Sequence, residues 1–418
     1  MDAASLLSFG LGLEPPWKLS GQHVDTDKKP NEVFLEITSD RGARYPCPVC
    51  GALCKAHDFK EFTWRHLNLF QHHCYVTARL PRVDCPDHGT KRIKAPWARE
   101  GSQFTLLFEQ AALILIREMP VLAAARIIGV SDTRLWRVVK YYVSRAVSRL
   151  DLSGLKAVAL DETASKRRHN YVTVFIDLDK KQKPVVFATP GKGKQCLAEF
   201  KKFLKEHGGV GENIAEVVCD MSPAFLAAIS EEFPKANVTV DWFHVVQLFT
   251  KAVDDVRKTE GKEKKMPKAA RWAVLKAADG GGLTVKQKMA LEELESTGFA
   301  TATAWRIKEK LRWVRKATTL HAAKWRITHF CRHALKCIAP DWQNLTPILK
   351  ALLTLEKHAD RILQMWNSTY SNARLEAFNG LFQAARARAR GYRNVSTFIL
   401  MIYFIAAPLG KLIEFHTA

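Results

Sequence analysis

An alternation of short apolar segments with helical ones over residues 156–241 constrains the fold of this chain more than any other feature. Short apolar runs bounded by turn residues are typical of strands. The strand-like segments are 156–160, 171–178, 184–189, 214–219 and 238–240, and the segments with helical periodicity are 195–207 and 222–233. This order predicts a mixed α/β sheet with helices on its faces.

Two of these strand-like segments lead directly into an aspartate. Asp161 follows 156–160 and Asp220 follows 214–219, so neighbouring strands can bring both carboxylates to one rim of the sheet. Two divalent ions held about 3.5–4 Å apart by shared carboxylates stabilise the attacking and the leaving oxygen of phosphoryl transfer. Mg²⁺ suits such a site because it prefers carboxylate and water ligands. A single strand-end aspartate is more often a turn former, so the pair carries the prediction rather than either residue alone.

Two further acids lie close to this pair in the sequence. Asp241 ends the segment 238–240 in the same way and is a candidate fourth acid. Glu162 directly follows Asp161, but it would point to the other face of a continuing strand.

A polar helix over 371–390 supplies the third acid of the predicted centre, Glu376. One face of this helix carries Asn372, Glu376, Asn379 and Gln383, extended by Arg386 and Arg390, and the opposite face carries Leu375, Phe378 and Phe382. A lone acid among amides can offer a metal ligand with phosphate contacts beside it, whereas the alternative is a solvated helix face. Residues 244–370, which separate this helix from the sheet, are helical in pattern with a glycine break at 280–282.

Two short cysteine motifs in the N-terminal part are typical of a zinc site. Cys47-Pro-Val-Cys50-Gly is a CxxC knuckle, and Cys85-Pro-Asp-His88-Gly is a CxxH knuckle. Each knuckle can present two ligands to one tetrahedral structural ion, and the glycine after it lets the backbone turn toward the sulfurs. A redox pair is the alternative for Cys47 and Cys50 alone. His88 is our choice of fourth ligand for its local spacing; the residues that could replace it are Cys54, His57, His66, His72, His73 and Cys74.

Residues 121–140 predict a helix, a tight turn and a second helix, within a helical zone that runs from 104 to about 150. Gly129 suits the left-handed position of the turn, and Ser131 can cap the second helix. That helix would expose Arg134, Arg137 and Lys140 toward a DNA groove and its phosphates. The alternative is an ordinary helical hairpin with a solvated basic face.

The charge balance favours the nucleic-acid interpretation. Lysine and arginine outnumber acids 64 to 42, a net charge of +22. Such an excess repels itself unless a polyanion neutralises it, and nucleic acid is the usual polyanion. No apolar run reaches the roughly 20 residues of a membrane span, and the longest, 398–408, predicts a buried helix. We see no signal peptide and expect a cytoplasmic protein without a membrane partner, whose nine cysteines are thiols or metal ligands.

Several longer motifs resemble the bacterial insertion-sequence transposases of the ISL3 family, and the resemblance covers nearly the whole chain. The shared motifs are CPVCG (47–51), CPDHG (85–89), PWA (96–98), FT (104–105), DET (161–163), YVTV (171–174), CDMSPAF (219–225), DWFHV (241–245), SNARLEAFNG (371–380) and ARGYRN (389–394). The resemblance implies an N-terminal zinc domain, a helix-turn-helix and a ribonuclease-H-like catalytic fold with a helical insertion. It places the catalytic acids of a DDE triad at Asp161, Asp220 and Glu376.

We therefore expect a multidomain α/β transposase that cuts and joins DNA with two Mg²⁺ ions, or Mn²⁺ in their place, and one structural Zn²⁺. Its expected parts are a zinc domain (1–100), a helix-turn-helix (101–150), a catalytic domain (151–245 with 371–418) and a helical insertion (246–370). Double-stranded DNA, as transposon ends and as target, is the expected partner, and paired ends would hold a homo-oligomer on the nucleoid. The alternatives are a nuclease of the same fold that only cuts, and a domesticated DNA-binding regulator.

The helical block holds many cations and tryptophans. We expect most of the tryptophans to be core residues, because aromatics at helical spacing usually pack. Some of the cations would instead face the DNA backbone near the cut. The cations concerned are Arg306, Lys310, Arg312, Arg315 and Lys316, and the tryptophans are Trp272, Trp305, Trp313, Trp325, Trp342 and Trp366.

Overall fold

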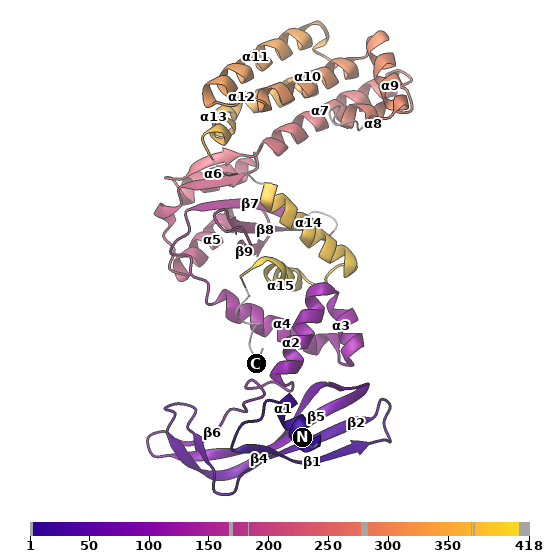
Figure 1. Ribbon diagram of the computed structural model, residues 1–418. Helices are drawn as coiled ribbons and strands as arrows, with labels where there is room; N and C mark the ends of the chain where they lie inside the picture. Colours follow the sequence, from indigo (N-terminus) through magenta and orange to yellow (C-terminus); the bar gives the residue numbers. More distant parts are fainter. Residues whose placement is uncertain are drawn as a thin grey trace. The chain divides into compact units, whose positions relative to one another are not determined.

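The computed structural model describes residues 3–166, 170–182, 184–276, 283–368, 370 and 373–408 (Figure 1). Of these, one compact unit comprises the residues up to Val147 together with Ala387–Arg390. The second unit comprises Ser148–Arg386 and Gly391–Pro408. Each unit is described by itself.

The first unit begins with helix α1 (Ala3–Gly10), which a six-stranded sheet follows. Its strands are β1 (Trp17–Asp25), β2 (Glu32–Ser39), β3 (Arg44–Pro46), β4 (Leu53–Leu69), β5 (His72–Cys85) and β6 (Gly89–Arg92). They lie in the order β1-β2-β5-β4-β3, with β6 also on β5. Only β2 and β5 pair in parallel among the described strands of this sheet. A cluster of edge-to-face tryptophans forms its core, because Trp97 contacts both Trp17 and Trp64.

The helices α2 (Leu106–Glu118), α3 (Val121–Ile128) and α4 (Asp132–Val147) follow this sheet. A fully buried carboxylate, Glu109 on α2, holds them together. It accepts hydrogen bonds from Arg99 Nε (2.9 Å), Ser102 Oγ (2.7 Å) and the Tyr142 hydroxyl of α4 (2.8 Å). Because a buried charge is tolerated only when it is paired and hydrogen-bonded, these contacts fix α4 against α2.

The second unit contains the predicted mixed sheet. Its strands are β7 (Ala157–Lys166), β8 (Asn170–Asp177), β9 (Val185–Pro190), β10 (Glu216–Cys219) and β11 (Asn237–Val240), in the order β11-β10-β7-β8-β9. Strands β7, β8 and β9 pair antiparallel, whereas β10 is parallel to both β7 and β11. The predicted strand over 156–160, with Asp161 at its end, is too short. Strand β7 continues to Lys166, because β8 pairs with it beyond that point.

Helices cover both faces of this sheet (Figure 1). Helices α5 (Lys194–Glu206) and α6 (Pro223–Glu232) pack on one face, where Phe175 and Phe200 stack with a ring separation of 4.4 Å. Helices α14 (Ala373–Arg388) and α15 (Val395–Ala406) also contact this sheet, at β7 and β9 respectively. On α15 the Tyr403 hydroxyl accepts a hydrogen bond from the Ala188 amide of β9 (2.9 Å). This apolar helix is buried as predicted, and none of the described helices is long and apolar enough to cross a membrane.

A helical block separates β11 from α14. Its α-helices are α7 (Trp242–Glu263), α8 (Ala270–Leu275), α9 (Val285–Ser296), α10 (Ala300–Arg315), α11 (Leu320–Ile338), α12 (Thr346–Lys357) and α13 (Ala359–Leu363). The 3₁₀ turns of this unit are η1 (Gly211–Asn213), η2 (Ala339–Asp341) and η3 (Gln364–Trp366). The predicted glycine break at 280–282 lies outside the described residues. Inside the block, Glu260 of α7 is buried and accepts hydrogen bonds from the amides of Ala300 and Thr301 (both 2.8 Å), so it caps α10.

The tryptophans of this block do not behave as predicted. Trp313 and Trp325 are 36% and 52% exposed, and Trp272 and Trp342 are exposed as well. Only Trp305 and Trp366 of the six named above pack partly into the described core of the block. Helical spacing shows that residues share a face of a helix, but it does not show whether another helix covers that face.

Candidate carboxylate centre, zinc site and DNA-binding residues

The strand register brings three aspartates to one level of the second sheet. The last paired residues are Val218 with Ala159 and Cys219 with Val240. Asp220 and Asp241 therefore each lie one step beyond the end of their strand, and Asp161 lies level with Asp220 on β7. Side chains alternate along a strand. Leu160 and Cys219 pack into the core under α5 and α6, so Asp161 and Asp220 point to the opposite face.

Local hydrogen bonds fix two of these aspartates at the sheet edge. Asp220 Oδ1 accepts from the Ser222 amide (2.9 Å). Asp241 is the N-cap of α7, where its Oδ1 accepts from the Phe243 amide (3.1 Å). Such turns and caps stop the strand and start the helix, which explains why an acid follows each strand.

Helix α14 places Glu376 and a row of amides against β7. The Asn379 side-chain amide donates to Asp161 Oδ2 (2.9 Å), while Asp161 Oδ1 accepts from the Glu162 amide (2.8 Å). One turn further, Gln383 donates to Thr163 Oγ1 (2.6 Å). The predicted burial of the opposite face holds for Leu375 and Phe382, whereas Phe378 is half-buried. Asn372, predicted for the polar face, lies outside the described residues.

Burial and mutual repulsion destabilise the charged forms of the acids in this group. Burial raises the pKa of Asp161, and the charge of Asp220 raises it further, whereas the hydrogen bond from Asn379 lowers it. Burial also raises the pKa of Glu376, with contributions from Asp241 and Asp161. These effects mean that the carboxylates are close enough to interact and that a bound cation would favour their charged forms.

Several buried polar atoms around these acids have no hydrogen-bond partner among the described residues. They are Glu376 Oε1, Asn379 Oδ1 and His244 Nε2. Buried polar atoms without partners are uncommon and point to a ligand or a catalytic role. A set of carboxylate and amide oxygens fits Mg²⁺ or Mn²⁺.

His244 is a residue that the sequence interpretation did not single out. It lies three residues after Asp241, on the first turn of α7, and its charged form would lower the pKa of both Asp161 and Glu376. The DWFHV motif contains the signal, since an N-cap aspartate and a residue three positions later lie at the same end of a helix.

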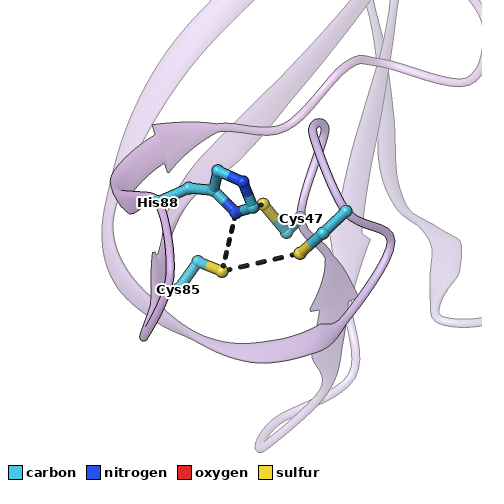
Figure 2. A group of neighbouring side chains, drawn as sticks. Cys47, Cys85 and His88 are labelled. Atoms are coloured by element: carbon cyan, nitrogen blue, oxygen red, sulfur yellow. Dashed lines mark hydrogen bonds between the residues drawn. The ribbon is translucent and has the colours of Figure 1, made fainter.

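Cys47, Cys50, Cys85 and His88 come together in the first unit, as predicted (Figure 2). Their ligand atoms all lie within 4.8 Å of one another; Cys85 Sγ is 3.7 Å from Cys50 Sγ and 3.5 Å from His88 Nδ1. Three thiols and an imidazole at this spacing fit a tetrahedral zinc ion. Among the described residues this is the only group of that kind so closely placed, and the three acids of the second unit are less tightly grouped.

The backbone of both knuckles matches the predicted turns. Gly51 and Gly89 have φ of 76° and 66°, the left-handed conformation that suits glycine. The hydrogen bond with His88 lowers the pKa of Cys85 to about 6, which favours the thiolate that a metal needs. The alternative ligand His57 instead hydrogen-bonds to Asp84 (3.0 Å).

The helix-turn-helix forms as expected from residues 121–140. Gly129 ends α3 with φ of 70°, and the Ser131 carbonyl accepts from the Arg134 amide (3.1 Å) at the start of α4. Leu135 and Val138 are buried, whereas Arg137 and Lys140 are exposed. Arg134 differs from the expectation. It is half-buried, its guanidinium lies 4.3 Å from the Phe104 ring centre, and it donates to Gln103 Oε1 (3.2 Å).

Other predicted DNA contacts are divided between exposed and engaged side chains. Arg390 is exposed, whereas Arg386 is half-buried and donates to the Ala164 carbonyl of β7. In the helical block, Lys310 and Lys316 are exposed, but Arg312 pairs with Glu309 (3.2 Å). The remaining two are exposed as well, although Arg306 lies 3.9 Å from Glu295 and Arg315 lies 6.0 Å from the Trp366 ring centre.

Comparison with known proteins matches three segments of the chain to transposase domains. Residues 158–402 match a transposase family of the DDE type, residues 93–143 match the helix-turn-helix domain of transposase family ISL3, and residues 44–88 match the zinc finger of the transposases of IS204, IS1001, IS1096 and IS1165. The transposase for insertion sequence element IS1001 of Bordetella parapertussis is 24% identical over 85% of this chain and 87% of its own length. The transposase for IS1557 of Mycobacterium tuberculosis is 26% identical over 81% of this chain and 80% of its own. The chain therefore belongs to the ISL3 family of insertion-sequence transposases, with a helix-turn-helix DNA-binding domain and a DDE catalytic domain.

Proposed function

We propose that Asp161, Asp220 and Glu376 are the metal-binding catalytic triad of this transposase. The observation that carries the proposal is the arrangement of these acids on one face of the sheet, where β10 ends. Asp161 and Asp220 lie level on adjacent strands, and Glu376 contributes a buried oxygen without a described partner from the facing helix. We also propose that the sheet, with its order β11-β10-β7-β8-β9, is the ribonuclease-H-like fold that the family resemblance implies.

The triad would hold two Mg²⁺ ions, or Mn²⁺, which neutralise developing charge on the attacking and leaving oxygens of the phosphodiester. In cleavage, a water oxygen attacks phosphorus and the bond to the 3′ oxygen breaks, leaving a 3′ hydroxyl. In joining, that hydroxyl attacks a target phosphodiester and displaces its 3′ oxygen. Asp161 would be oriented for this work by Asn379 and the Glu162 amide, which hold one carboxylate oxygen each.

His244 would act beside the acids as a positioning and charge-balancing residue. Its buried Nε2 has no described partner, and its positive form favours the charged carboxylates of Asp161 and Glu376.

The N-terminal part would supply the binding steps. Cys47, Cys50, Cys85 and His88 would hold one structural Zn²⁺ that ties β3 and β4 to β5 and β6, since the knuckles lie where these strands end. Arg137 and Lys140 would contact the transposon end. Arg134 would contribute less, because it already contacts Gln103 and Phe104. Arg386 and Arg390 would contact DNA near the cut. Paired ends would be held by a homo-oligomer on nucleoid DNA.

The test is an assay with a labelled duplex that carries a terminal inverted repeat of the element, together with a target plasmid. In Mg²⁺ or Mn²⁺, purified protein should cut at the repeat boundary and join the labelled 3′ end to the plasmid. Cleavage without any joined product would identify a nuclease of the same fold. Binding without either product would identify a DNA-binding regulator. Both outcomes would contradict the proposed cutting and joining of DNA.

A further inference from the structure

A basic hollow lies in the first unit, on the sheet that carries the cysteine knuckles, and sheet and turn residues rather than helix-turn-helix residues line it. Its volume is about 530 Å³. The end of β2, the turn before β3, and residues of β3, β4 and β5 line it. The turn is closed by a hydrogen bond between the Ser39 and Tyr45 hydroxyls and by the Ala43 amide, which donates to the Asp40 carbonyl (3.2 Å). The hollow is therefore built from paired strands and a bonded turn.

Four of the twelve residues that line the hollow are cationic. Arg41, Arg44, Lys55 and Arg79 all line it and are all exposed. Arg44 and Lys55 are directly opposite each other in the β3–β4 ladder. Two like charges in directly opposite positions normally destabilise a pair of strands. A sheet keeps such a pair at low cost only where water or an anion screens it.

The hollow holds little negative charge to offset these cations. Its one lining acid, Asp40, is already bound by Lys18 Nζ (2.6 Å). Within the described part of the chain, none of the four lining cations makes an ion pair. Arg79 faces Glu61 in the ladder, yet its guanidinium lies 5.9 Å from the centre of the Phe59 ring, which is itself 42% exposed in the hollow. Four cations thus lie on an open concave surface whose one lining acid is already paired with Lys18.

We propose that this hollow is a second DNA-binding surface, which holds the phosphodiester backbone of double-stranded DNA through Arg41, Arg44, Lys55 and Arg79. Open, concave and cationic surfaces raise the local concentration of polyanions, and a phosphate has the charge to relieve the repulsion between Arg44 and Lys55. The contacts are with phosphates and therefore carry no sequence preference. A second copy of this chain fits the surface poorly, because every copy carries the same net charge of +22.

The test replaces all four cations by glutamine in the full chain and measures binding to a fluorescein-labelled duplex of about 30 base pairs of mixed sequence, by anisotropy over a range of salt. We expect roughly tenfold or greater loss of affinity at low salt. The slope of log affinity against log salt should fall by about 0.9 for each phosphate contact removed. The melting temperature should stay the same or rise, because the Arg44–Lys55 repulsion is gone.

A matched control separates the hollow from the overall charge of the protein. Lys29, Lys60, Lys91 and Lys94 are exposed cations of the same unit that do not line the hollow. Their replacement by glutamine gives the same net charge, but it should leave most of the affinity and the slope intact. Equal losses in the two variants would mean that only bulk charge matters and would overturn the proposal, as would wild-type binding by the hollow variant.

A smaller variant, Arg44→Gln with Lys55→Gln, covers the case in which the fourfold variant misfolds. It removes the opposed pair alone, and its slope should fall by about 1.8. These binding outcomes do not depend on the catalytic triad, so failure of the hollow and failure of the proposed chemistry can be told apart.

Discussion

The hydrogen bond from Asn379 to Asp161 makes a quantitative prediction about metal binding. Asn379→Ala removes the donor that holds Asp161 Oδ2 at 2.9 Å and leaves only the Glu162 amide, on Oδ1, to orient this carboxylate. A hydrogen bond to a charged group contributes about 1.5–3 kcal/mol. Partners behind a metal ligand are usually worth about 10–100-fold in metal affinity. We therefore expect the Mg²⁺ concentration for half-maximal cleavage to rise about 10–100-fold, with the rate at saturating Mg²⁺ much less affected.

The pH dependence gives an independent readout of the same bond. Asn379 lowers the pKa of Asp161 against the effect of burial, so its loss should raise that pKa further. A protonated carboxyl cannot bind the metal. The acidic limb of the cleavage–pH profile should therefore move to higher pH in Asn379→Ala, which a purely structural defect would not cause.

Gln383→Ala is the matched control for this experiment. Gln383 lies one turn along the same face of α14 and bonds to Thr163 and the Ala164 carbonyl, not to a triad acid. The substitution Gln383→Ala should loosen the contact between α14 and β7 without changing the Mg²⁺ concentration needed for half-maximal cleavage. If Asn379→Ala cleaves with the wild-type Mg²⁺ requirement, or if Gln383→Ala shifts that requirement equally, the proposed role of Asn379 is wrong.

Four further predictions follow from individual contacts. Metal analysis of the full chain should find about one Zn²⁺. The ion should be lost in Cys50→Ser and in His88→Ala but kept in Cys54→Ser. Full zinc content in the first two variants would rule out the assigned ligands. Arg137→Ala with Lys140→Ala should weaken binding to the transposon end and lower its salt slope by about 1.8 without changing the melting temperature, and an unchanged slope would leave α4 without a DNA contact. Glu260→Gln should cost about 1–3 kcal/mol in unfolding experiments, because one α10 amide loses its acceptor in a buried site, whereas the exposed Glu263→Gln should cost little. Asp161→Asn should melt at or above the wild-type temperature near neutral pH without metal, because burial raises the pKa of this carboxyl and deprotonation then destabilises the fold as pH rises. A large loss of stability in this variant would contradict a destabilising charge at Asp161.

The sequence was informative wherever local spacing decides the structure. The two knuckles, the turn at Gly129 and the aspartates that follow β10 and β11 all depend on neighbours a few residues away. The extent of β7 was mispredicted because Asp161, Glu162 and Thr163 resemble a polar strand end. Pairing with β8, which the strand composition alone does not specify, carries the strand on to Lys166.

Features that depend on distant packing were not predictable in this way. The bond between Asn379 and Asp161 joins residues 218 positions apart. The exposure of Trp313 and Trp325 depends on which helix faces are covered, and the partial burial of Arg134 depends on where Phe104 lies. The basic hollow likewise appears only when four separate strands and a turn are assembled.

Metal rescue tests the central claim, that Asp161, Asp220 and Glu376 bind the catalytic metal ions, most directly. Each acid is replaced in turn by cysteine, and strand cleavage of the labelled transposon end is measured in Mg²⁺ and in Mn²⁺, with Glu231→Cys on the exposed side of α6 as control. A thiolate binds Mn²⁺ better than Mg²⁺, so the account predicts loss of cleavage in Mg²⁺ and partial recovery in Mn²⁺ for all three variants, with DNA binding unchanged. Substantial cleavage in Mg²⁺ by any of the three would contradict the assignment of that residue.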